Sequence, residues 1–133
     1  MKEMQFELFE KAAMDKILCG EDNALEILRE QYKDAIVTER EFTGVGFFST
    51  FHICDKSAKL KSHHSIQICD VIGQLDEIPY GVGFVLFITG GVIDTLEGFT
   101  YGDQKWPEHF AEFSLSYIAG NSRDMEHLQN KWK

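Results

Sequence analysis

A nearly unbroken apolar segment, Val82–Thr89, is followed directly by the pair Gly90-Gly91 and then by a second strand-like segment. A Gly-Gly pair supplies the positive φ angles of a two-residue primed turn, so this stretch predicts a β-hairpin. Because its first segment is apolar at almost every position, we expect a central strand that is covered on both faces. The turn also sets a register, which places these residues opposite each other: Phe87 and Asp94, Phe84 and Glu97, Gly83 and Gly98.

The rest of the chain divides into segments of helical and of strand-like periodicity. Apolar residues recur every three or four positions in residues 2–18 and again in a segment that Asp22 or Asn23 can cap. Strand-like composition marks residues 35–53, 65–71 and 110–118, and a last short helix follows Ser122. The order predicts an α+β fold: two N-terminal helices packed on one face of an antiparallel sheet, with a short C-terminal helix.

Size and charge restrict the partners of this chain. With 133 residues we expect one domain, residues 1–133. The formal net charge is −9, from 22 Asp and Glu against 13 Lys and Arg. Nucleic acids and anionic membranes attract cationic surfaces, so we expect neither as a partner. A net negative charge favours association with a basic protein, although acidity is also common in proteins without such a partner.

Cysteine number and hydropathy indicate the compartment. The three cysteines, Cys19, Cys54 and Cys69, are an odd number without CxxC spacing, which favours a reducing environment over a disulfide framework. The N-terminal residues carry acids and lack the apolar core of a signal peptide. No apolar segment approaches the roughly 20 residues of a membrane span. We therefore expect a cytoplasmic protein.

The strongest candidates for chemistry are histidines, cysteines and an aspartate in the middle of the chain. If the strands near Phe51 and Ile66 pair, these side chains approach one another, but their spacing matches no familiar zinc module. The alternative is a polar loop end with solvated histidines and cysteines that act as small core residues. Cys54 and Cys69 both precede an aspartate, which raises the pKa of a thiol and disfavours a nucleophile. We assign no catalytic residue, metal or cofactor, and leave open a metal site formed from this group: His52, Cys54, His63, His64, Cys69 and Asp70.

The segment LEGFTYGDQKWPEHF combines aromatic rings with acids, and it favours an interface with a basic protein. In such an interface the rings supply buried area and the acids steer association. The alternative is that Tyr101 and Trp106 fix this connection onto the sheet. Reversing Asp103 and Glu108 to Lys should slow association if this surface binds. The predicted partner-binding residues are Asp94, Glu97, Tyr101, Asp103, Trp106 and Glu108.

Four short motifs resemble those of small bacterial immunity proteins from polymorphic toxin systems, including contact-dependent growth inhibition. They stand at residues 43–48, 83–87, 96–102 and 106–107, so the resemblance extends over residues 42–117 and leaves the N-terminal helices outside. It implies an α+β fold and neutralisation of a cognate toxin by tight binding, and it carries no catalytic residues. We expect the toxin to be basic, with a nuclease as one option.

Two other classes remain open. The chain could be a small ligand-binding or metal-dependent enzyme domain, with a pocket between sheet and helices that holds His52, Cys54 or Asp70. It could also be an oligomerisation module, for which an exposed edge at Val82–Thr89 would be the sign.

Overall fold

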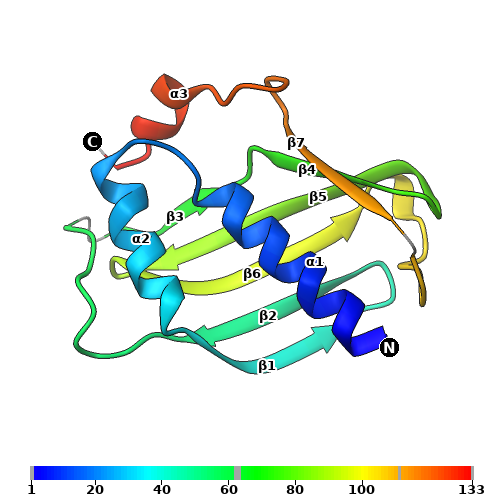
Figure 1. The fold of residues 1–133 in the computed structure, drawn as a ribbon, viewed down its shortest axis with the longest axis horizontal. Coiled ribbons are helices and arrows are strands. Elements are labelled where there is room, and N and C mark those ends of the chain that lie inside the picture. The colour runs from blue at the N-terminus through cyan, green and yellow to red at the C-terminus, as the bar shows by residue number, and fades with distance from the viewer. Residues whose placement is uncertain (1, 62–63, 111, 133) are drawn as a thin grey trace.

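Two helices at the N-terminus lie against one face of an antiparallel sheet, and a third, short helix follows the last strand (Figure 1). This arrangement is seen in a computed structural model that describes residues 2–61, 64–110 and 112–132. It confirms the predicted α+β fold. The elements are α1 (Lys2–Ile17), α2 (Asn23–Lys33), β1 (Ile36–Phe42), β2 (Gly46–His52), β3 (Ile66–Ile68), β4 (Val71–Leu75), β5 (Ile78–Thr89), β6 (Val92–Thr100), a 3-10 turn at Tyr101–Asp103, β7 (Phe113–Tyr117) and α3 (Met125–Gln129).

The second helix begins where the sequence predicts. Asp22 caps α2, where its carboxylate accepts the backbone N–H groups of Ala24 and Leu25 at 2.9 and 3.2 Å. Arg29 fixes the connection to α1, since its guanidinium donates to the carbonyls of Leu18 and Gly20 at 2.6 and 2.9 Å. The helix pair is thus joined by a short, hydrogen-bonded turn.

The sheet has seven strands in the order β1-β2-β6-β5-β4-β7, and β3 also pairs with β5. The segment 35–53, which looks like one extended stretch in the sequence, forms two strands around a turn at Gly44, where φ is +96°. Strand β5 lies between β6 and the pair β3 and β4, so the sign of an oligomerisation module, an exposed Val82–Thr89 edge, is absent from this strand. The strand order ends at β1 and β7, and β3 is paired on one side only.

The central hairpin starts in the predicted register and then shifts by one residue. Thr89 pairs with Val92 and Ile88 with Ile93, but Phe87 then pairs with Thr95. Residue Asp94 is therefore added on β6 as a bulge. As a result the three predicted pairs were each wrong by one position, and the observed pairs are Phe87 with Thr95, Phe84 with Gly98 and Gly83 with Phe99.

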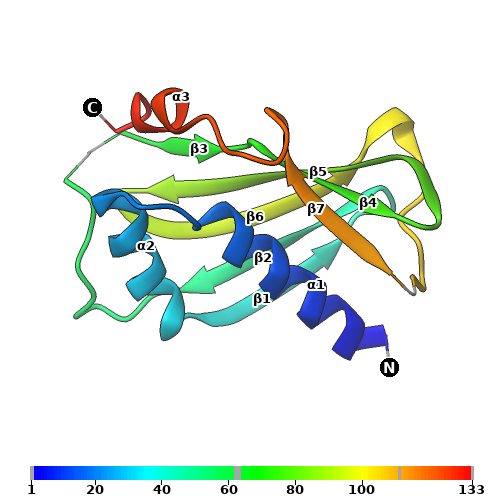
Figure 2. The ribbon, with the colours of Figure 1, turned by 45° about the horizontal axis from the view of Figure 1, so that its top comes forward.

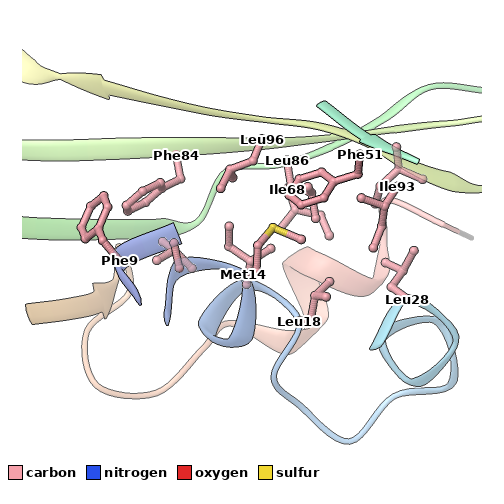
Figure 3. Packing of buried hydrophobic residues seen from close by; sticks show 14 of the residues in the cluster. Phe9, Met14, Leu18, Leu28, Phe51, Ile68, Phe84, Leu86, Ile93 and Leu96 are labelled. Atoms are coloured by element: carbon pink, nitrogen blue, oxygen red, sulfur yellow. The ribbon is translucent and has the colours of Figure 1, made fainter. Parts of the chain in front are cut away.

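Apolar side chains from the helices and from one face of the sheet form a single hydrophobic cluster (Figure 3). Phe9, Met14 and Leu18 of the N-terminal segment point toward Phe84 and Leu86 of β5, and all five are almost fully buried. The core therefore lies on one side of the sheet, between the sheet and the helices.

Within the described residues, no helix is both long and apolar enough to cross a membrane.

Candidate functional site: the open face of the sheet

The side of the sheet away from α1 and α2, which we call the open face, carries no helix in the described part of the chain (Figure 2). Side chains alternate along each strand. On β2, for example, Phe47 and Phe51 are buried against the helices, while Phe48 between them is only half-buried. The register places the following strand residues together on the open face: Glu39, Glu41, Phe48, Thr50, Val85, Phe87, Thr95, Glu97 and Phe99.

Glu97 lies at the centre of the open face, in a row that crosses four strands. Glu41 of β1 pairs with Phe48 of β2, Phe48 with Glu97 of β6, and Glu97 with Val85 of β5. Burial by these neighbours raises the pKa of the Glu97 carboxyl above its usual range. No described side chain forms a hydrogen bond or ion pair with this carboxylate. A partly desolvated anion without a cation is suited to pairing with an external one.

The strands are almost free of cationic side chains. The chain has 13 Lys and Arg, yet only Arg40 lies in one of the seven strands, all of which are fully described. Arg40 points to the helix side, where Nε and Nη2 donate to the buried carboxylate of Glu10 at 3.0 and 2.7 Å. The open face itself therefore presents carboxylates that no Lys or Arg of a strand neutralises.

Two aromatic rings flank the acidic row at the far end of β6. Phe99 and Tyr101 contact each other edge to face, with ring centroids 5.4 Å apart. They occupy the space left by the missing side chain of Gly83, since a Cβ there would lie 2.6 Å from Phe99 Cζ and from Tyr101 Oη. Tyr101 is 38% exposed, and burial, with a smaller effect of Cys69, raises its pKa. The pair thus offers apolar surface next to the carboxylates.

The six residues predicted to bind a partner do not share one surface. Glu97 and Tyr101 lie on the open face, and Asp94 lies at its hairpin end, where it accepts a hydrogen bond from Thr89 Oγ1 at 3.0 Å. Trp106 turns the other way and packs on Phe9 and Phe47, with ring centroids 5.9 and 5.4 Å apart.

The last two predicted residues belong to the loop after β6. Asp103 is exposed at the 3-10 turn, where its φ is +55°. Glu108 lines a small aromatic pocket of about 620 Å³ beside Trp106. Glu39, Glu41 and Phe48 lie on the open face but outside the segment that the sequence singled out, whereas Phe99 is one of the rings of that segment. The sequence pattern that marks these residues is the alternation of polar and aromatic side chains along β1, β2 and β6. This pattern indicates a shared surface only when the pairing of the three strands is known.

The histidines and cysteines are dispersed in the described part of the chain. His52 is exposed on the open face, Cys54 and Cys69 are exposed, and Asp70 pairs with Arg123 at 2.7 Å. No group of three or more His, Cys, Asp and Glu in the described residues is placed to hold a metal ion. His63 lies outside the described residues.

Comparison with family models, with curated proteins and with solved structures finds no match to this chain. The resemblance of residues 42–117 to immunity proteins therefore stays a prediction from the sequence.

Proposed function

We propose that this chain is an immunity-type protein that binds a basic toxin domain through its open face and neutralises it. The observation that carries the proposal is the charge of that face. Glu39, Glu41 and Glu97 lie on it, and none of the strands places a Lys or Arg side chain there. Like charges on the partner would be repelled, whereas Lys and Arg would be attracted. A basic partner is therefore the class of protein that this surface selects.

The open face also has the size and composition of a protein interface. A strand of nine residues, the length of β6, extends about 30 Å, and strands are about 4.8 Å apart. Strands β1, β2, β6 and β5 together thus offer on the order of 500 Å² of flat area, which side chains enlarge toward the roughly 800 Å² that each partner buries in a standard interface. Phe48, Phe99 and Tyr101 supply the aromatic anchors typical of energetic hot spots.

Glu97 is the residue that we expect to contribute most to affinity. An arginine of the partner could donate two hydrogen bonds to its carboxylate while the guanidinium packs against Phe48. A hydrogen bond to a charged group contributes about 1.5–3 kcal/mol. Replacing Glu97 by Gln should therefore weaken binding roughly tenfold to a hundredfold.

The test is a tagged pull-down of this chain against the protein encoded immediately upstream, followed by binding kinetics at several salt concentrations. Tight one-to-one binding, with an association rate that falls as salt rises, supports the proposal. The double reversal Glu39→Lys with Glu97→Lys should slow association. Glu21→Lys with Glu26→Lys, an equal charge change on the helix side, should have a much smaller effect.

A third variant, Asp103→Lys with Glu108→Lys, tests whether the loop after β6 also contributes. Equal effects of the open-face and helix-side reversals would show that net charge, and not the open face, governs binding, and would reject this surface. A strong effect confined to the loop variant would move the interface to the Trp106 side of the molecule.

A further inference from the structure

A concave site lies on the side of the sheet opposite the open face, between the two long helices. Figure 1 shows α1 and α2 side by side over the same face of the sheet. Residues of both helices, of the turn between them and of β1 and β2 line a cleft. Its volume is about 900 Å³, within the range of small-molecule sites. Its lining includes Leu18, Tyr32, Ala35, Val37 and Phe51.

Polar contacts from the sheet hold the α1 wall of this cleft in place. The Glu10 carboxylate, only 4% exposed, accepts hydrogen bonds from Arg40 of β1 and from the Ser49 hydroxyl of β2. Breaking this pair is costly because it leaves the charge of the buried Glu10 without its cation. Helix α1 is therefore fixed relative to β1 and β2.

A second set of buried hydrogen bonds holds the α2 wall. Gln31 is fully buried, and its amide N–H groups donate to the carbonyls of Ala58 and Gly91 at 2.9 and 3.0 Å. Its amide oxygen accepts the backbone N–H of Ile93 at 2.9 Å. Since both walls are tied to the sheet, the cleft is preformed, and a ligand would not have to order it.

The charged residues around the cleft already have partners. Lys11 pairs with Asp15 at 3.0 Å, and Lys33 pairs with Glu30 at 2.8 Å. Arg29 donates to backbone carbonyls, and Glu10 is satisfied as described above. Glu21 is the exception, but it is exposed to solvent. A charged ligand would gain little here, whereas an apolar one would cover Ala35 and Val37, which are only half-buried.

The lining also offers an uncharged polar group to a ligand, the hydroxyl of Tyr32. The Tyr32 ring contacts Phe51 edge to face, with centroids 6.0 Å apart, and its hydroxyl forms no hydrogen bond with a described residue. Burial, followed by the nearby Asp15 and Glu10 charges, raises the pKa of Tyr32 to about 12. The hydroxyl thus stays protonated at neutral pH and can donate a hydrogen bond.

We propose that the cleft between α1 and α2 binds a small, uncharged and largely apolar molecule that carries a hydrogen-bond acceptor, which the Tyr32 hydroxyl would contact. This site is separate from the open face, so the inference does not depend on the proposed toxin partner.

Nile red, an uncharged aromatic dye with a carbonyl acceptor, is the probe for this site. We expect a blue-shifted, saturable fluorescence signal with one dye per chain. Ala35→Trp fills the cleft and should weaken binding by at least roughly tenfold. The control Ile118→Trp adds the same side chain at a position that is 64% exposed and outside the cleft, and should leave binding unchanged.

Two further measurements test the chemistry of the site. Tyr32→Phe removes only the hydroxyl and should weaken Nile red binding about two- to tenfold, as expected for loss of one neutral hydrogen bond. The anionic dye 8-anilino-1-naphthalenesulfonate should bind more weakly than Nile red. No saturable Nile red signal, equal binding by the Ala35→Trp variant, or tighter binding of the anionic dye would each overturn the proposal.

Discussion

Glu97 of β6 pairs in register with Phe48 of β2, so a carboxylate lies beside an aromatic ring on the open face of the sheet. On its other side Glu97 pairs with Val85 of β5. Both neighbours restrict the access of water to the carboxylate, and no described cation compensates for this. The free protein therefore retains a partly desolvated charge at the centre of the open face.

Replacing Glu97 by Gln should make the free protein slightly more stable at pH 7. The amide keeps the shape of the side chain but removes the cost of desolvating the charge. We expect a gain of roughly 0.5 kcal/mol in the free energy of unfolding, measured by urea denaturation. Glu39→Gln, on the exposed edge strand of the same face, is the control and should change little.

The gain in stability from Glu97→Gln should depend on pH. Because the folded state raises the pKa of Glu97 above its usual 4.5, the unfolded chain loses this proton at lower pH than the folded one. The destabilising effect is absent below the unfolded pKa and is complete above the folded pKa. The stability difference between Glu97→Gln and the natural chain should therefore shrink as the pH falls through this range. A difference that stays constant down to pH 3 would contradict the desolvation argument.

Gln31→Leu should destabilise the fold strongly. The buried amide of Gln31 connects α2 to the loop after β2 and to the turn of the central hairpin, through Ala58, Gly91 and Ile93. Leucine would remove the bonds of Gln31 to the Ala58 carbonyl and the Ile93 N–H, at a cost of about 3 kcal/mol, whereas the Gly91 carbonyl keeps the backbone N–H of Leu60. The control is Gln129→Leu, which removes one hydrogen bond to Asp22 and should cost about 1 kcal/mol or less. Equal losses for the two variants would argue against Gln31 as an anchor.

Glu10→Gln should also cost stability, because it removes the charge that pairs with Arg40 in a buried setting. Loss of one partner of a fully buried pair costs about 3 kcal/mol or more. Because the Arg40 side chain is 29% exposed, we expect a smaller loss here, of about 1.5–3 kcal/mol. Lys11 and Asp15 form an exposed ion pair on the same helix. Asp15→Asn should therefore change the free energy of unfolding by less than about 1 kcal/mol in the same urea experiment. A loss as small for Glu10→Gln would mean that the buried pair contributes no more than the exposed one.

Sequence periodicity was sufficient to predict the class of the fold but not the details of the sheet. The helical stripes, the Asp22 cap and the Gly90-Gly91 turn are local signals, and each was correctly interpreted. The bulge at Asp94 is not local, because it allows both Ile93 and Leu96 to face the helices, and this requirement arises only in the folded core. The register of the hairpin was therefore wrong by one residue.

The predicted interface depended on composition within one loop, and composition carries no information on direction. Tyr101 and Trp106 are five positions apart in an acidic, aromatic segment, yet Tyr101 lies on the open face while Trp106 packs on Phe9 and Phe47. Glu39 and Glu41, in contrast, are distant from this loop in sequence and reach the open face only through the pairing of β1 with β2. A surface assembled across strands cannot be found from one contiguous segment.

Gly83→Val tests how the aromatic end of the open face is built. A Cβ at position 83 would lie 2.6 Å from both Phe99 Cζ and Tyr101 Oη, so the two rings must move away from the sheet. We expect a loss of about 1–3 kcal/mol in the free energy of unfolding, typical of overpacking, together with shifted ring resonances of Phe99 and Tyr101 in NMR spectra. Ser114→Val, at an exposed position of β7, is the matched control and should leave both quantities nearly unchanged. If Gly83→Val left the stability and the two ring resonances unaltered, the contact of these rings with the bare backbone of β5 would be disproved. If the rings shift and the proposed partner then binds more weakly, the aromatic pair and the acidic row act as one surface.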